Sequence, residues 1–179
     1  MSPEEISALT RAGKKRRLWT PTEQTVTVDY GRDVVQRLLP HRDPMLFVDR
    51  ITAIDRTIPG LAATRRIDPN DPVFVGHFPG FPIYPGVLEL ETMGQAGICL
   101  AHFANRGTDL VAPDAKPTDV RALKIHTALF LAEVLPGDEL TILATLLDAN
   151  DQTAICAGQL LKGEAVTAFA IMEVYLVEG

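Results

Sequence analysis

The stretch VLELETMGQAGICLAHFA, residues 87–104, constrains the fold of this chain more than any other. It contains no proline and consists mostly of good helix formers, and Pro85–Gly86 stands directly before it, so it predicts a helix. Apolar residues occur almost all round that helix, which is typical of a helix buried on every side. Such a helix is buried rather than amphipathic, so other segments of the chain must pack against it.

The segments that can wrap the helix have the β-branched content and partial alternation of strands. Turn residues such as Pro136–Gly137–Asp138 separate them. An antiparallel sheet beside one buried central helix is an α+β design, and a chain of 179 residues with 46% hydrophobic residues can bury a substantial core. The predicted strands cover residues 45–55, 61–67, 120–134, 139–148, 152–162 and 165–177.

The chain divides into an N-terminal extension and one domain. Residues 1–33 are polar and lack sustained periodicity, apart from a helix-like stretch over 3–12, so we expect a peripheral and partly disordered extension. Five of the first 17 residues are Lys or Arg, a basic arm that could touch an acidic partner. The domain proper spans 34–179 and begins with a short helix that ends at Pro40.

Composition excludes several classes of protein. A net charge of −6 gives no reason to expect a nucleic-acid partner. No apolar run has membrane-spanning length, and the N-terminus lacks the apolar core of a secretory signal. Cys99 and Cys156 sit in apolar runs and neither has a CxxC or His-rich neighbourhood, which favours free thiols and no metal site. We therefore expect a cytoplasmic protein.

A loop dense in proline and glycine, DPNDPVFVGHFPGFPIYPG at 68–86, precedes the central helix. Five prolines and three glycines exclude a helix or a central strand there, and they hold a long loop in one shape at low entropic cost. A rigid loop is useful where a side chain must be aimed. Of the four histidines in the chain, only His77 lies in this loop.

The predicted helix carries two glutamates in its first turns. Glu89 and Glu91 are two residues apart, about 200° around the helix axis, so they cannot share a face. Glu91 and Gln95 are four residues apart and do share one. One of the two can be solvated near the helix start while the other points inward, and we expect Glu91 to be a buried carboxyl whose pKa is raised by burial.

Three segments of the chain resemble 3-hydroxyacyl-[acyl-carrier-protein] dehydratases of the hotdog superfamily. GHFPGFPIYPGVLELETMGQ at 76–95 is similar to the active-site segment of that family. LLPHRDPMLFVDR at 38–50 and VLPGDEL at 134–140 are similar to its N-terminal signature and to a strand–turn element. Their order and spacing agree with the family over about 34–178. The resemblance implies a hotdog fold, an antiparallel β-sheet wrapped around a long central α-helix.

The resemblance also implies the site residues. The catalytic histidine falls on His77 and the catalytic carboxylate on Glu91, fourteen residues later. The backbone N–H of Gly86 would bind the thioester oxygen, and neither a cofactor nor a metal is expected. Further substrate contacts would come from Phe78, Pro85 and Gln95.

The remaining histidines are expected to have structural roles. His41 lies in the N-terminal signature and would cap or pack locally, and His126 lies in a strand. His102 lies near the end of the helix, where a cation suits the helix dipole.

The function implied is a hydro-lyase that removes water from 3-hydroxyacyl thioesters in fatty acid or related acyl-chain synthesis. A sister subfamily that also isomerises the double bond carries Asp at the carboxylate position, so Glu91 favours simple dehydration. Two alternatives stay open: a hotdog thioesterase, and a non-catalytic acyl-binding partner of another hotdog subunit.

The resemblance also implies partners. The substrate would arrive on an acidic acyl carrier protein, and the subunits would form homodimers or higher homo-oligomers, up to a hexamer. The family's basic residues before the PGD turn are replaced here by ALFLAEV, residues 128–134. A docking patch must then lie elsewhere. The candidates are Arg65, Arg66, Arg121, Lys124 and the basic cluster at 14–17.

Overall fold

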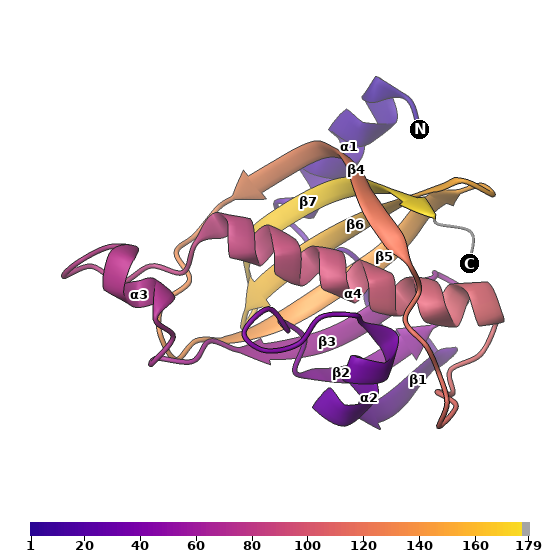
Figure 1. Ribbon diagram of the computed structural model, residues 1–179. Helices are drawn as coiled ribbons and strands as arrows, with labels where there is room; N and C mark the ends of the chain where they lie inside the picture. The colour runs from indigo at the N-terminus through magenta and orange to yellow at the C-terminus, as the bar shows by residue number, and fades with distance from the viewer. Residues whose placement is uncertain (177–179) are drawn as a thin grey trace.

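A seven-stranded antiparallel sheet curls around one long helix in the computed structural model, which describes residues 1–176 (Figure 1). The strand order is β1-β2-β3-β5-β6-β7-β4. The α+β class and the hotdog architecture predicted from the sequence are confirmed. The helices are α1 (Pro3–Gly13), α2 (Arg32–Leu38), α3 (Val73–Gly76) and α4 (Gly86–Arg106). The strands are β1 (Thr25–Tyr30), β2 (Arg50–Asp55), β3 (Gly60–Arg66), β4 (Val120–Phe130), β5 (Glu139–Ala149), β6 (Thr153–Lys162) and β7 (Ala165–Leu176).

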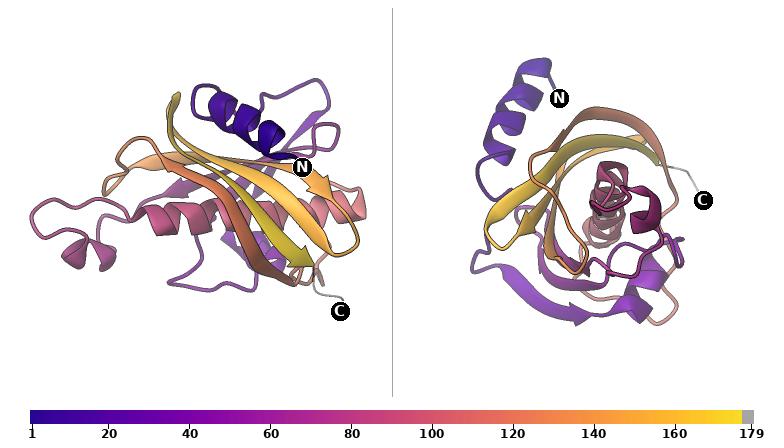
Figure 2. Two further views of the ribbon diagram at one scale, coloured as in Figure 1. Left: turned by 90° about the horizontal axis from the view of Figure 1, so that it is seen from above. Right: turned by 90° about the vertical axis from the view of Figure 1, so that its left-hand side faces the viewer.

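Helix α4 lies in the concave face of the sheet, where the end-on view shows it surrounded by strands (Figure 2). Ten of its 21 residues are buried, and Met93, Leu100 and Phe103 belong to the main core cluster. Gly107 ends the helix in the left-handed conformation, at a φ of 60° that favours glycine. The expected helix over 87–104 is confirmed and extends slightly further at both ends.

Residues 1–33 differ from the expected solvated extension. Strand β1 pairs with β2 at the edge of the sheet, and α1 lies on the face of the sheet opposite α4 (Figure 2). Ile6 and Leu9 of α1 pack against Phe169 of β7. A Cβ on Gly13 would lie 2.2 Å from the Phe169 ring, so the helix can approach this closely only with glycine there.

A buried glutamine fastens the segment after α1 to the sheet. The side chain of Gln159 in β6 donates to the carbonyls of Gly13 at 2.6 Å and Arg16 at 2.7 Å, and it accepts from the Leu18 N–H at 2.7 Å. All the hydrogen-bonding groups of the amide except one lone pair are thereby used. Residues 1–33 thus form an ordered outer layer of the same domain.

Asp55 at the end of β2 anchors the chain just before β1. Its carboxylate is fully buried and accepts hydrogen bonds from the hydroxyls of Thr22, Thr25 and Thr57, each at 2.6 Å, and from the Ile58 N–H. Burial alone would raise the pKa of Asp55, but these hydrogen bonds outweigh it and hold the pKa well below its usual range. The carboxylate therefore stays charged in the folded protein.

Two local expectations need correction. The strand predicted over 45–55 begins only at Arg50, and residues 45–49 form a turn and extended chain. The loop at 68–86 contains one helical turn, α3, because Pro72 stands at its N-terminal end, where a missing N–H costs nothing. The predicted domain end at 179 lies outside the described residues. Within residues 1–176, no helix combines the length and apolar character needed to cross a membrane.

Candidate active site

The loop that carries His77 projects beyond the N-terminal end of α4, away from the sheet (Figure 1). Backbone hydrogen bonds close it: the His77 N–H donates to the Val73 carbonyl at 3.0 Å, and the Ile83 N–H donates to the His77 carbonyl at 2.9 Å. The His77 Nδ1 lies 2.8 Å from the Ile83 carbonyl oxygen. A carbonyl only accepts, so Nδ1 carries the proton. In the neutral ring, Nε2 is then left as a base.

The neighbours of His77 divide into exposed and buried residues. Phe78 is half exposed and its ring stacks on the His77 ring, with centroids 4.1 Å apart. Pro85 is buried, and its carbonyl accepts from the N–H groups of Leu88 and Glu89, so in this structure it begins α4. Of the two, only Phe78 exposes its side chain to solvent.

Gly86 is the first residue of α4, and its N–H has no acceptor among residues 1–176. A free N–H at the start of a helix lies at the positive end of the helix dipole. A Cβ at this position would lie 2.9 Å from the ring of Phe130. Glycine is needed here because Phe130 of β4 covers the backbone.

Glu91 lines a groove of about 440 Å³ between α4 and the ends of β4, β6 and β7. Most of its lining is apolar. Gly94 and Gly97 of α4 have no side chains and therefore leave space in the groove. An elongated apolar cavity with one carboxyl at its wall suits an acyl chain that carries a reactive polar group. The lining includes His41, Glu91, Gly94, Gly97, Ile125 and Met172.

Two side chains hold the Glu91 carboxyl. Gln95 donates from Nε2 to Glu91 Oε1 at 2.8 Å, and His41 Nε2 lies 3.3 Å from the same oxygen. Gln95 is fully buried; it also donates to the Met45 carbonyl and accepts from the Phe47 N–H, each at 2.8 Å. The expected substrate contact from Gln95 is therefore replaced by a role in holding Glu91.

The expectation for the two glutamates of α4 is wrong. Glu89 is only 3% exposed, whereas the Glu91 side chain is 37% exposed. Burial raises the pKa of Glu89 to about 8, and its Oε2 has no hydrogen-bond partner in the described chain. The physical reason is that the sheet covers the Glu89 side of α4, while the Glu91 side faces the groove.

One chain does not bring His77 and Glu91 together in one cavity. The lining of the groove includes Glu91 and His41 but no residue of the loop that carries His77. That loop instead presents apolar side chains to solvent, namely Val75, Phe78 and Phe81. A surface of this kind on a projecting loop is typical of a contact with another chain.

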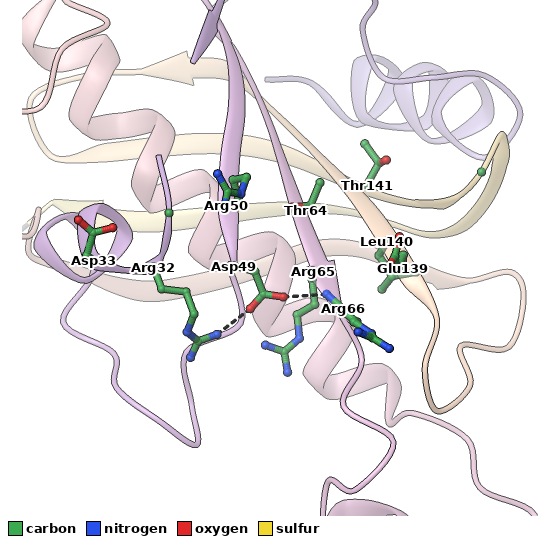
Figure 3. Close-up of a pocket in the computed structure, with 12 residues that line it drawn as sticks. Arg32, Asp33, Asp49, Arg50, Thr64, Arg65, Arg66, Glu139, Leu140 and Thr141 are labelled. Atoms are coloured by element: carbon green, nitrogen blue, oxygen red, sulfur yellow. Dashed lines mark hydrogen bonds and ion pairs between the residues drawn. The ribbon is translucent and has the colours of Figure 1, made fainter. Parts of the chain in front are cut away.

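A second hollow, of about 940 Å³, lies over β2, β3 and β5 and is lined by charged residues (Figure 3). Asp49 accepts from Arg32 Nη1 at 2.6 Å and from the Arg66 N–H at 2.7 Å. The lining of this hollow contains neither His77 nor Glu91. Arg32 and Asp49 form an ion pair within this hollow, and Arg65 is buried against Phe47, so part of its charge has a structural role. Among residues 1–176, no cluster of three or more His, Cys, Asp or Glu could hold a metal ion.

Two of the remaining histidines lie away from the His77 loop. His126 pairs with Glu173 at 2.8 Å. His102 is buried, and desolvation and the nearby Arg106 lower its pKa to about 4, so it is neutral rather than the cation expected from the helix dipole. His41 contacts Glu91, a role that sequence reasoning missed although His41 lies in the family signature.

Fold and site together define a hotdog enzyme that acts on acyl groups. The FabA-like domain model matches residues 39–170. The chain is 36% identical to a 3-hydroxyacyl-[acyl-carrier-protein] dehydratase FabZ of Aliarcobacter butzleri, over 80% of this chain and 95% of that protein. It is 43% identical to the FabZ of Methylobacterium nodulans, over 66% of this chain and 69% of that protein. The chain therefore belongs to the FabZ-type dehydratases of the FabA-like family.

Solved structures agree on the fold. A chain of the dehydratase heterocomplex ApeI:P from Xenorhabdus doucetiae superimposes with a TM-score of 0.62 at 19% identity, covering 80% of this chain and 91% of that one. At this identity the likeness shows a shared architecture. The resemblance inferred from the three sequence segments is thus confirmed by the family match and, for the fold, by the structure.

Proposed function

We propose that the protein dehydrates 3-hydroxyacyl thioesters at a site shared between two subunits, with His77 from one and Glu91 from the other. Its family makes it a hydro-lyase of acyl-chain synthesis. The observation that supports the shared site is the separation of the two residues: His77 lies on a projecting apolar loop, and Glu91 lies in a groove that this loop does not reach.

The residue chemistry suits the reaction. His77 Nε2 takes the proton from C2 of the substrate, the C2–C3 double bond forms, and the C3–O bond breaks. The Glu91 carboxyl gives its proton to the departing hydroxyl, which leaves as water. Negative charge that develops on the thioester oxygen is stabilised by the free N–H of Gly86 at the start of α4. Exchange of one proton with solvent restores both groups.

The open edge strand of the sheet, β4, supports the proposal of a homodimer. Strand β4 has no partner on its outer side among the described residues, and it is 11 residues long. Leu123, Ile125 and Phe130 of this strand are exposed. A long apolar edge strand is covered in native proteins, because open N–H and C=O groups invite pairing. A second copy would cover β4 and bring its His77 loop toward the groove; larger assemblies, including a hexamer, would be built from such dimers.

An acyl carrier protein is the proposed carrier, by analogy with the relatives whose names include it. Some of the candidate Arg and Lys residues are buried or paired in the structure and so are not available to such an acidic partner. Arg65 is buried, donates to the Leu46 carbonyl at 3.0 Å and stacks on Phe47, so it is withdrawn from docking. Arg121 pairs with Asp119. Lys124 lines the groove, and Arg66 and the basic cluster at 14–16 are exposed, so these candidates remain.

A cytoplasmic location completes the proposal. Cys99 and Cys156 are both free thiols, the first buried and the second partly buried. Unpaired buried thiols are the usual state in a reducing compartment.

Mixing two inactive variants tests the shared site. His77→Ala and Glu91→Gln should each lower the hydration of a 2-enoyl thioester on acyl carrier protein by at least about 10², because each removes one proton-transfer group. Combined under conditions of verified subunit exchange, they should recover part of the activity, since a hybrid dimer contains one intact site. Absence of recovery, or a monomer by light scattering, would contradict the shared site. Thiol release measured in parallel detects a thioesterase.

A further inference from the structure

His41 is a groove residue that the proposed reaction does not yet use. It follows α2 and lies 50 positions before Glu91 in the chain, yet its Nε2 is 3.3 Å from Glu91 Oε1. Its side chain is 25% exposed and lines the groove together with Glu91. A reacting thioester that reaches Glu91 must therefore pass close to the His41 ring.

The segment that carries His41 is fixed to α4 rather than free to move. Arg42 donates to the carbonyls of His41 at 2.7 Å and Leu39 at 2.9 Å, which holds the backbone on either side of Pro40. Gln95 binds the following residues through Met45 and Phe47. The same Gln95 amide also contacts Glu91 Oε1. His41 and Gln95 therefore approach one oxygen of Glu91 from a common rigid support.

The hydrogen-bond inventory determines which ring nitrogen of His41 carries the proton. Nδ1 is buried and has no partner in the described chain. A proton on Nδ1 would be an unpaired buried donor. A proton on Nε2 instead faces Glu91 Oε1 at a nitrogen–oxygen distance of 3.3 Å and leaves only a lone pair on Nδ1 unused. The neutral Nε2–H tautomer is the form that fits this site.

We propose that His41 is a positioning residue, whose Nε2–H fixes the orientation of the Glu91 carboxyl. With donors from His41 and Gln95, Oε1 acts only as an acceptor, and the proton that Glu91 transfers resides on Oε2. No residue of the described chain donates to Oε2, which leaves it available to the substrate hydroxyl. Without His41 the carboxyl can rotate and present the wrong oxygen. This inference rests on the proposed role of Glu91 as the proton donor.

Three variants of the full-length protein separate positioning from packing. His41→Gln keeps an N–H at a similar reach, whereas His41→Phe keeps a planar ring without a donor. His126→Phe is the matched control, since it removes a His–Glu contact of 2.8 Å that does not involve Glu91. We expect His41→Phe to lower kcat by about tenfold to 10² with KM changed less than about threefold, which is the range for lost orientation of a proton-transfer group. His41→Gln should retain most of kcat, and His126→Phe should stay within about threefold of wild type.

A second measurement addresses coupling between the two residues. In Glu91→Asp the shorter side chain withdraws the carboxyl from His41, so adding His41→Phe should cause little further loss in kcat. Equal losses in both backgrounds, or equal losses for His41→Gln and His41→Phe, would overturn the positioning role. Even if the positioning role is overturned, a large loss of kcat in Glu91→Gln would still support the proposed function. An inactive wild-type protein would instead refute the proposed function.

Nitrogen chemical shifts of the imidazole rings report the tautomer independently of activity. The His41 signals, identified by their loss in His41→Phe, should show a protonated Nε2 and an unprotonated Nδ1 at neutral pH. Protonation at Nδ1 would overturn the proposal even if the variant were impaired. The thermal unfolding midpoint of each variant identifies any that loses activity because it fails to fold.

Discussion

Two carboxyl groups stand two residues apart on α4, and the two faces of the helix give them opposite surroundings. On the sheet side, Glu89 is buried and its Oε2 has no partner. On the groove side, Glu91 is partly exposed, accepts a hydrogen bond from Gln95, lies 3.3 Å from His41 Nε2, and borders an apolar cavity. The burial that raises the pKa of Glu89 to about 8 also separates it from any substrate.

The comparison shows that a strongly raised pKa does not by itself identify a catalytic carboxyl. A proton donor needs access to the substrate and a fixed orientation as well as an available proton. Glu91 has access and orientation in a single chain, and a second subunit that covers the groove would add burial. Glu89 has only burial. Asp55 shows the opposite extreme, because it is just as buried but its hydrogen bonds hold its pKa low.

The largest expected difference between the two glutamates is in turnover. Glu91→Gln should lower kcat by at least about 10², because the neutral amide cannot deliver the proton. Glu89→Gln should keep kcat within about threefold of wild type, since its carboxyl faces the sheet. Steady-state rates with one 2-enoyl thioester, measured side by side, make the test. A large loss in Glu89→Gln with an unchanged fold would reverse the assignment of the two residues.

The second expected difference is in stability as pH changes. The pKa of Glu89 rises from an ordinary value of 4.5 to about 8 on folding. Its neutral form therefore favours the folded state fully below about pH 4.5, and this contribution is lost as pH rises through about 8. Over that window a shift of this size corresponds to a loss of at most roughly 5 kcal/mol.

Replacement of the buried carboxyl should remove this dependence. Glu89→Gln is neutral at every pH, so its free energy of unfolding should fall less between pH 5 and 8 than that of the wild type. Urea unfolding at both pH values measures the difference, and Glu91→Gln, at the more exposed position, is the matched control. The histidines titrate in both proteins and cancel in the comparison. Parallel pH profiles for wild type and Glu89→Gln would show that Glu89 is solvated in solution.

Much of the fold could be predicted from the sequence, because helices and turns are indicated by residues that are close together in the chain. The proline-free apolar run at 87–104 predicted α4, and the turn at 136–138 separated β4 from β5. The environment of Glu89 and Glu91 could not be predicted in this way. Helical periodicity gives the angle between two side chains, but which side the sheet covers depends on packing among distant strands.

Contacts between distant segments account for the other differences. The ordered outer layer formed by residues 1–33 depends on Gln159 and Phe169, nearly the whole chain away. The contact of His41 with Glu91 spans 50 residues and follows from the way Gln95 holds the intervening segment. The family signature around His41 was the one local sign that this segment serves the site.

The smallest expected difference concerns the volume on the two faces of α4. The sheet side is filled by large residues such as Met93 and Phe103, whereas the groove side carries Gly94 and Gly97. Glycine inside a helix is unfavourable by about 1 kcal/mol relative to alanine. A Cβ on Gly94 would meet nothing nearer than Met172 Sδ at 3.9 Å, so tight packing does not require this glycine. Its absent side chain instead leaves room in the groove, which we expect to hold the acyl chain.

Gly94→Leu should therefore shorten the acyl chain that the enzyme accepts. The leucine side chain extends into the groove of about 440 Å³ and occupies space that a long chain needs. We expect kcat/KM for a decenoyl thioester to fall about tenfold, the size of effect that one extra apolar group has in a hydrophobic pocket. The value for a crotonyl thioester should change less than about threefold. Gly94→Ala is the matched control, because its methyl group fits without displacing Met172. Equal losses for both chain lengths would mean that the acyl chain lies elsewhere, and the two faces of α4 would then differ in charge and packing alone.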